Sequence, residues 1–460
     1  MAMAFLVPLA VVALLAAAIT WLWDYTFMLL VWRPYAIGKK LRRQGIHGPT
    51  YKVVKGCKED IKTMKEETDG LVLDVHDHNY LPRIAPHYLK WRAQYGEPFL
   101  YWFGPKPRIC IFDYELARQI LSSKSGHFVK NDPPATLLDV VGNGLALLDG
   151  VDWMMTTTML ACAQSMINEL ENQTFQNKNG EIEVDLNIQF RELAADVISH
   201  AAFGSSYKLG KQVFQIQHDL MAINVASALD VQIPGLRYLP TERNRRRRML
   251  EKKLRSSLMQ IIQPRLASTS RDYGDDLLGL MLESCNETKQ GGEEGGLGMS
   301  IDEIIHECKM FYFAGHDTMT MVVLETLRLY CPPLFMQRKP IVDITVGGMK
   351  LPKGVAVVIP IPIMHREEEV WGDDAGEFNP LRFENGVTRA AKVPHAMLGF
   401  AMGPRSCIGQ NFAMLEAKSA LAVMLQKFSF TLSPDYVHAP TDIFMLKPKF
   451  GLPVILRRLG

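Results

Sequence analysis

Paired cysteines and excess charge are both scarce in this sequence. Its seven cysteines are scattered over 460 residues and never form a C-x-x-C pair. This pattern argues against a disulfide framework or a zinc ribbon and favours a reducing compartment. The net charge is only +2, so composition gives no case for a nucleic-acid binder. No internal repeat is visible. What the chain does have is 48% hydrophobic residues, enough for a large core.

Charge is also missing from the N-terminal end. Ala2 to Trp23 contains no charged residue and, as a helix, would span about 33 Å, enough for a bilayer core. Basic residues follow from Arg33 onwards, which places the rest of the chain on the cytoplasmic side. The alternative is a cleaved signal peptide, which normally has a charged n-region and a shorter apolar run. We predict a transmembrane anchor at residues 1–32 and a globular part at residues 33–460.

The globular part has mainly helical patterns with a few strands. Two strand-like runs, Phe99–Phe103 and Arg108–Phe112, flank Gly104-Pro105 and predict a β-hairpin. Alternating residues between Asp343 and Ile361 predict further strands. The expected helices cover His87 to Tyr95, Asp113 to Leu121 with Asp113 as N-cap, Gln189 to Phe203, Gln212 to Ala228, Thr241 to Ala267 and Asp275 to Glu283. We expect a mainly α fold with a small β subdomain, not a doubly wound α/β fold.

One stretch near the C-terminus carries the strongest chemical signal. Cys407 lies between Gly403 and Gly409, with Arg405 and Phe400 before it and an amphipathic helix after it. That helix is expected to bury Met414, Ala417, Leu421, Met424, Leu425 and Phe428. A cysteine before a helix N-terminus is placed to become a thiolate, and such a thiolate suits a haem.

On the haem interpretation, each residue of this stretch has a role. Cys407 ligates the iron, Arg405 pairs with a propionate, the two glycines clear room under the macrocycle and Phe400 shields the sulfur. The alternative is an ordinary buried cysteine beside a glycine-rich turn.

A second candidate site lies upstream. Ser300 and Glu303 form a capping box that opens a helix, and this helix contains Ala314, Gly315, Asp317 and Thr318. A glycine inside a helix costs about 1 kcal/mol relative to alanine, so it needs a reason. The residues either open a groove for dioxygen, with Asp317 and Thr318 moving protons, or pack a glycine against another helix.

The five fixed positions from Phe400 to Gly409 match F-x-x-G-x-R-x-C-x-G, the haem-binding signature of the cytochrome P450 family, which the chain resembles. The upstream motif resembles the family's A-G-x-[DE]-T. By this resemblance Thr318 and Asp317 deliver protons to the oxygen site, which Ala314 and Gly315 line. Glu325 and Arg328 resemble the E-x-x-R motif and Arg382 the P-x-R-F motif; together they would form a buried structural triad. Further haem contacts would be Arg338, as a propionate partner, and Trp153.

The resemblance extends to plant microsomal members of the seventy-two clan. It implies haem b as cofactor, electrons from NADPH through a reductase, and an endoplasmic reticulum membrane protein with a cytosolic catalytic domain. It implies hydroxylation of a lipophilic small molecule. A fatty acid is the first expectation, with terpenoid or cytokinin hormones as alternatives. The other hypotheses are a haem-binding but inactive relative and a membrane-anchored protein without a cofactor.

Two departures from the family pattern stand out. Only six residues separate Thr318 from Glu325, where the family has several tens. Six residues span about 9 Å as helix or about 20 Å extended, too little to reach the opposite side of a haem. After Trp153 the family's arginine is replaced by Thr157, and a basic segment before Met159 is missing. We therefore expect residues 300–330 to form one fused helix or a distorted oxygen-side pocket.

Overall fold

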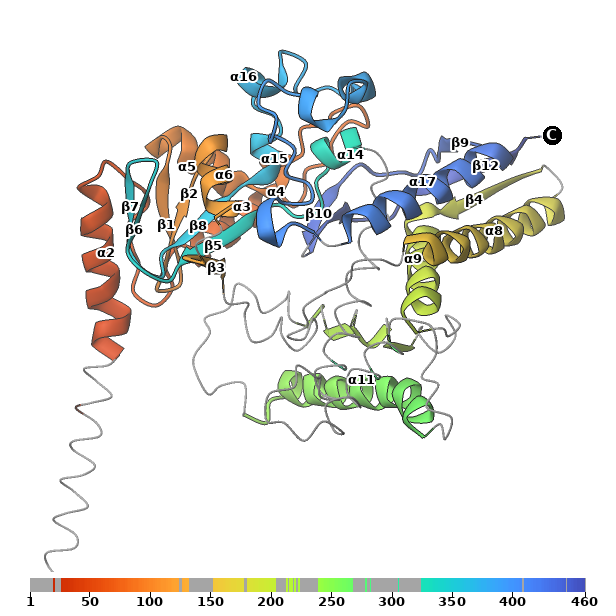
Figure 1. The fold of residues 1–460 in the computed structure, drawn as a ribbon, viewed down its shortest axis with the longest axis horizontal. Helices are drawn as coiled ribbons and strands as arrows, with labels where there is room; N and C mark the ends of the chain where they lie inside the picture. The colour runs from red at the N-terminus through yellow and green to blue at the C-terminus, as the bar shows by residue number, and fades with distance from the viewer. Residues whose placement is uncertain are drawn as a thin grey trace, which may run out of the picture.

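The computed structural model describes most of the chain (Figure 1). The described residues are 26–123, 126–131, 152–177, 180–203, 239–267, 324–407, 409–443 and 445–459, with shorter pieces at 20, 212–213, 215–217, 219–220, 222–223, 278, 282 and 305.

The N-terminal third contains short helices around a hairpin. Its helical elements are the π-helix η1 (Met28–Trp32), α2 (Arg33–Arg42), α3 (Lys58–Thr68), α4 (Leu81–Ile84), α5 (Pro86–Tyr95) and α6 (Tyr114–Leu121). Its strands are β1 (Phe99–Phe103), β2 (Lys106–Cys110) and β3 (Phe128–Lys130). Asp113 caps α6 by accepting from the Leu116 N–H, and α5 ends at Gly96, whose φ is 80°. The predicted hairpin, helix and cap are confirmed.

The described part of the middle of the chain is mainly helical, with one strand. It contains α8 (Asp152–Gln176), β4 (Glu181–Asp185), α9 (Leu186–Phe203) and α11 (Glu242–Leu266). Thr241 caps α11 through the Asn244 N–H, so that this predicted helix begins where expected. The two other helices predicted here, at 212–228 and 275–283, lie largely outside the described residues.

The C-terminal third returns to the same sheet and then forms a long helix. Its strands are β5 (Met336–Pro340), β6 (Ile344–Val346), β7 (Met349–Leu351), β8 (Ala356–Ile359), β9 (Phe428–Leu432), β10 (Pro440–Ile443), β11 (Met445–Pro448) and β12 (Pro453–Arg458). Its helical elements are α14 (Leu324–Leu329), α15 (Ile361–Met364), α16 (Glu368–Trp371), η3 (Pro380–Phe383), η4 (Val387–Arg389), η5 (Gly403–Arg405) and α17 (Gln410–Lys427). The strands predicted between Asp343 and Ile361 are confirmed.

Two distant parts of the chain build the five-stranded sheet, in the order β1-β2-β8-β5-β3. Strands β1 and β2 pair antiparallel, whereas β2 and β8 pair parallel with Ile109 opposite Val357. In Figure 1 the cyan strands β8 and β5 of the C-terminal third lie between the orange strands β2 and β3 of the N-terminal third, in one layer. Four of the five residues of β1 are buried, because both faces of the strand are covered. The sheet therefore ties the cysteine-containing third to the N-terminal third.

A second core forms where α8, α9 and α17 meet the sheet β4-β12-β9. Of the residues predicted for the buried face of α17, Ala417, Met424 and Phe428 are buried, Met414 and Leu421 are half-buried, and Leu425 is 49% exposed. The prediction for Leu425 is wrong because each helical residue advances by about 100°, and Leu425 therefore follows Met424 off the buried stripe. The long blue helix α17 leads from the cysteine stretch to this core (Figure 1).

Within the described residues no helix combines the length and the apolar character that crossing a membrane requires. Of the predicted anchor, residues 1–32, the structure describes Thr20 and residues 26–32, so its apolar run from Ala2 to Trp23 lies outside the described residues except for Thr20.

Candidate functional site

The cysteine stretch is a tight turn closed by backbone hydrogen bonds. The Cys407 N–H donates to the Phe400 carbonyl at 2.7 Å, and the Ala401 N–H donates to the Leu398 carbonyl at 2.8 Å. Helix α17 begins at Gln410 with Gly409 as its N-cap. Cys407 therefore lies just before a helix N-terminus, as its sequence context predicts. Phe400 contributes its carbonyl to this turn.

Cys407 differs from the other described cysteines. Cys57, Cys110, Cys162 and Cys331 are buried, whereas Cys407 is exposed. Neighbouring protein atoms still desolvate its sulfur enough to raise the pKa of the thiol, while the Gly409 N–H and the Lys130 ammonium act in the opposite direction. The helix-end contribution that the sequence predicts is thus present, and it is smaller than the effect of burial.

Three cations lie close to one another beside this cysteine: Lys130 interacts with the Cys407 sulfur, and Arg338 and Arg405 interact with Lys130. Lys130 on β3 lies directly opposite Arg338 on β5, and Arg405 donates to the Phe128 carbonyl at 3.1 Å. Only Arg338 is buried, at 6% exposure. Its pKa is lowered by desolvation and then by Arg405, and the pKa of Lys130 is lowered by desolvation and by both arginines. Among the described residues, no carboxylate pairs with any of the three.

This cluster is electrostatically costly as it stands. Like charges directly opposite each other on paired strands destabilise a sheet, and Arg338 has one described hydrogen-bond acceptor, the Gln337 carbonyl at 2.9 Å. A buried cation without a counter-charge in its own chain is normally neutralised by a bound ligand or by a partner. The arrangement therefore fits an anionic group beside the Cys407 sulfur.

Gly403 has a local structural reason to be glycine. Its φ is +74°, and an added Cβ would lie 2.5 Å from the Leu121 carbonyl oxygen at the end of α6. This close approach requires glycine whether or not the residue also clears room under a macrocycle, the role predicted for it. Among the described residues, a Cβ on Gly409 would meet only the Cys407 sulfur, at 4.0 Å, which is ordinary contact.

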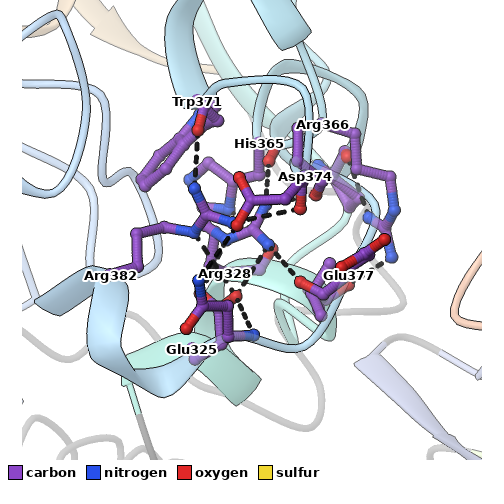
Figure 2. Close-up of polar contacts among 12 residues, drawn as sticks. Glu325, Arg328, His365, Arg366, Trp371, Asp374, Glu377 and Arg382 are labelled. Atoms are coloured by element: carbon purple, nitrogen blue, oxygen red, sulfur yellow. Dashed lines mark hydrogen bonds and ion pairs between the residues drawn. The ribbon is translucent and has the colours of Figure 1, made fainter.

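The three residues predicted to form a triad lie together (Figure 2). Arg328 donates to both oxygens of Glu325, at 2.7 and 2.8 Å, and both side chains are fully buried. Arg382 approaches the same carboxylate at 3.5 Å and pairs more closely with Asp374, at 2.8 Å. The Asn379 N–H donates to Glu325 at 3.0 Å. The carboxylate therefore joins α14 to η3, far apart in sequence.

The N–H groups of Arg328 that do not bind Glu325 donate to backbone carbonyls. Its guanidinium donates to the carbonyls of His365, Ala375 and Glu377, at 2.6, 2.7 and 3.1 Å. Arg382 likewise donates to the carbonyls of Trp371 and Asp374. Figure 2 shows contacts of this kind from the two arginines to Trp371, His365 and Glu377. The triad thus fixes the course of the loop between α15 and η3.

Sequence reasoning missed His365, which links this triad to the cysteine stretch. The side chain is fully buried, and its two ring nitrogens contact the Arg328 carbonyl and the Leu398 N–H, each at 2.9 Å. Burial lowers the pKa of His365 to about 3. No periodicity or spacing points to this residue, because both contacts cross more than thirty positions of sequence.

Several predicted site residues lie outside the described part of the chain. They are Ala314, Gly315, Asp317 and Thr318. Trp153 lies on α8, but its side chain is not among those described. Of the expected fused region, the structure describes residue 305 and the segment from Leu324, where α14 begins. The expectation of a fused helix or distorted pocket therefore stays a prediction.

Comparison with known proteins identifies relatives along nearly the whole chain. A family model described as cytochrome P450 matches residues 82–324 and 319–454. Cytochrome P450 709B1 of Arabidopsis thaliana is 41% identical over 500 positions, covering 94% of this chain and 95% of that protein. Cytochrome P450 709B3 of the same plant is 38% identical, covering 99% of each. The structure of retinoic acid-bound cyanobacterial CYP120A1 is similar, with a TM-score of 0.67 at 21% identity, covering 82% of this chain and 96% of that one.

These matches also bear on the missing segments. The two family matches meet at residues 319–324, between Thr318 and Glu325. The alignment with 709B1 has 500 positions and this chain has 460 residues, so at least 40 positions of the relative have no counterpart here. Residues present in the relatives are therefore absent from this chain.

Proposed function

The chain belongs to the cytochrome P450 family, whose members are haem-thiolate monooxygenases that hold haem b and take electrons from a reductase, and we propose that Cys407 is the iron ligand here. Haem b held by a thiolate activates dioxygen for insertion of one oxygen atom into a substrate C–H bond. The observation that carries the proposal is an exposed cysteine beside Lys130, which together with Arg338 and Arg405 forms a group of cations without a described carboxylate partner.

The described residues fit this cofactor. Haem b brings two propionates, and Arg338, Arg405 and Lys130 supply cations that have no described carboxylate partner. Arginine suits this task because its fork binds a carboxylate through two donors. We assign Arg338 and Arg405 to the propionates as the sequence predicts, and we add Lys130, which sequence reasoning did not single out. Trp153 is proposed as a further haem contact.

The other residue roles follow from the family motifs. Glu325, Arg328 and Arg382 hold the loop that precedes the cysteine stretch, which supports a structural role for the triad. Thr318 and Asp317 are proposed to move protons at the oxygen side, with Ala314 and Gly315 lining it. Gly403, Gly409 and Phe400 shape the turn that carries Cys407.

For the substrate we propose a lipophilic small molecule, with a fatty acid first and a terpenoid or cytokinin hormone next. The support is the likeness to plant relatives of the seventy-two clan. We further propose that residues 1–32 anchor the catalytic domain, residues 33–460, to the cytosolic face of the endoplasmic reticulum membrane. There an NADPH-dependent cytochrome P450 reductase would supply the electrons.

A second candidate function is a haem-binding protein without turnover. The shortened stretch between Thr318 and Glu325 favours it, because six residues leave little room to place both motifs. Co-expression with a plant reductase separates the two candidates. An active enzyme consumes NADPH and forms hydroxylated fatty acid, whereas the second candidate binds haem and forms no product. A Cys407→Ala variant should lose the bound haem, and its retention of haem at wild-type level would contradict the assignment of the ligand.

A further inference from the structure

His365 lies between the buried triad and the cysteine turn. It follows α15, and its side chain points into the group of polar contacts around Arg328 (Figure 2). Arg328 and His365 exchange two hydrogen bonds. The guanidinium donates to the His365 carbonyl at 2.6 Å, and the ring Nδ1 lies 2.9 Å from the Arg328 carbonyl.

The second ring nitrogen fixes the tautomer. The Leu398 N–H is a donor, so Nε2, at 2.9 Å from it, must accept. The proton is therefore on Nδ1, where it donates to the Arg328 carbonyl. One neutral imidazole thus connects the backbone of α14 to the backbone at Leu398.

Leu398 is also connected towards the cysteine. Its carbonyl accepts from the Ala401 N–H at 2.8 Å, and Ala401 has the unusual φ of 61° for a residue other than glycine. Phe400, between them, accepts from the Cys407 N–H at 2.7 Å. A residue held in this backbone region costs free energy and persists only where its surroundings determine it. The Leu398 N–H bond is one such constraint.

We propose that His365 is a positioning residue for Cys407, which transmits the placement of the triad to the turn that carries the sulfur. The expected change in the haem spectrum rests on the proposed function. The expected change in amide exchange rests on the hydrogen bonds alone. A partner that orients a metal ligand typically changes metal affinity 10–100-fold when it is removed.

Two substitutions separate the two bonds of His365. In His365→Gln the side-chain oxygen can reach the Leu398 N–H in place of Nε2. In His365→Asn the amide nitrogen can replace Nδ1, and the Leu398 N–H loses its acceptor. His87→Asn is the matched control, because His87 is also buried, at 7% exposure, lies on α5 and has no described partner for Nδ1.

The first measurement is amide hydrogen exchange of the full-length protein, which does not depend on haem. We expect the Leu398–Cys407 segment to exchange about fivefold faster in His365→Asn, the factor that corresponds to one ordinary hydrogen bond. The β1–β2 hairpin should be unchanged. His365→Gln and His87→Asn should leave the cysteine segment protected as in the wild type.

The second measurement is the carbon monoxide spectrum of the reduced protein. His365→Asn should lower the fraction with the red-shifted thiolate Soret band and speed haem loss about tenfold, whereas His365→Gln should restore both. Equal behaviour of the two variants, or faster exchange throughout the protein, would overturn the inference. If His365→Asn yields no folded protein, loss of Leu398 protection in His365→Gln overturns it and retained protection supports it. Absence of the band from the wild type contradicts the proposed function instead, and the exchange experiment still tests His365.

Discussion

Arg328 and Arg338 are both buried arginines, and their surroundings are opposite. Arg328 donates to both oxygens of Glu325 and to three carbonyls. Arg338 lies opposite Lys130, near Arg405, and has one described carbonyl acceptor. A buried charge whose donors are all satisfied holds a fold together, whereas one without a counter-charge indicates a ligand. The comparison separates the structural half of the site from its binding half.

The largest expected effect comes from removing the counter-charge of Arg328. Glu325→Ala removes the acceptor and leaves Arg328 buried without a counter-charge, so unfolding should become easier by about 3–5 kcal/mol. Denaturant unfolding of the purified protein measures the change. Glu377→Ala is the control, because its side chain is exposed and only its carbonyl accepts from Arg328. A loss as large in Glu377→Ala would show that the charge of Glu325 is not the cause.

Glu416 is a buried carboxyl group without a described counter-charge, and it therefore extends the comparison from a buried cation to a buried acid. Glu416 on α17 is 2% exposed, neither carboxylate oxygen has a described partner, and burial raises the pKa of Glu416 well above its usual value. The folded protein therefore holds a proton that the unfolded chain releases near its ordinary pKa, so stability falls as the pH rises above that value. Glu416→Gln should remove this fall and stabilise the protein at neutral pH, by about 1.4 kcal/mol for each unit between the ordinary pKa and the working pH over which the folded protein keeps the proton.

Thermal unfolding measured between pH 5 and pH 8 checks this expectation. Glu169→Gln, on the exposed face of α8, is the matched control and should leave the pH dependence unchanged. An unaltered slope in Glu416→Gln would contradict the assignment.

Arg338→Leu should act in two directions. Removal of a charge opposite Lys130 should stabilise the protein freed of haem by about 0.2–1 kcal/mol. The same variant should lose haem faster, measured as haem transfer to apomyoglobin, because a propionate loses its partner. Lys350→Leu, at an exposed position on β7, should change neither. Destabilisation of the haem-free protein would place Arg338 with Arg328 as a structural residue.

The smallest effect on stability is expected for an ion pair that is fully formed but exposed to solvent. Glu115 and Arg118 pair on the surface of α6, and hydrogen bonds from Arg118 and then Gln119 lower the pKa of Glu115 to about 2. Solvent screens such pairs, so Glu115→Gln should leave the Tm unchanged. A decrease in Tm as large as that of Glu325→Ala would show that burial does not account for the difference between the two ion pairs.

Local patterns predicted the local structure. The hairpin around Gly104, the cap at Asp113 and the helix after Gly409 follow from turn residues, capping side chains and hydrophobic spacing, all within a few positions. The same spacing misplaced Leu425, because a continuous apolar run does not show which edge of the stripe is exposed.

Contacts across the chain were not predictable from spacing. Glu325 and Arg382 were paired only through the resemblance, since fifty-seven positions separate them. Lys130 and His365 were missed because their importance arises when β3 pairs with β5 and when Leu398 meets the imidazole. The glycine requirement at Gly403 likewise depends on the end of α6.

The most direct test of the account is the carbon monoxide difference spectrum of the reduced full-length protein, recorded beside that of Cys407→Ala. We predict a red-shifted Soret band in the wild type, which thiolate ligation of the iron imposes, and its absence from the variant. A wild-type protein without this band, or a variant that keeps it, would contradict the assignment of Cys407 as the iron ligand.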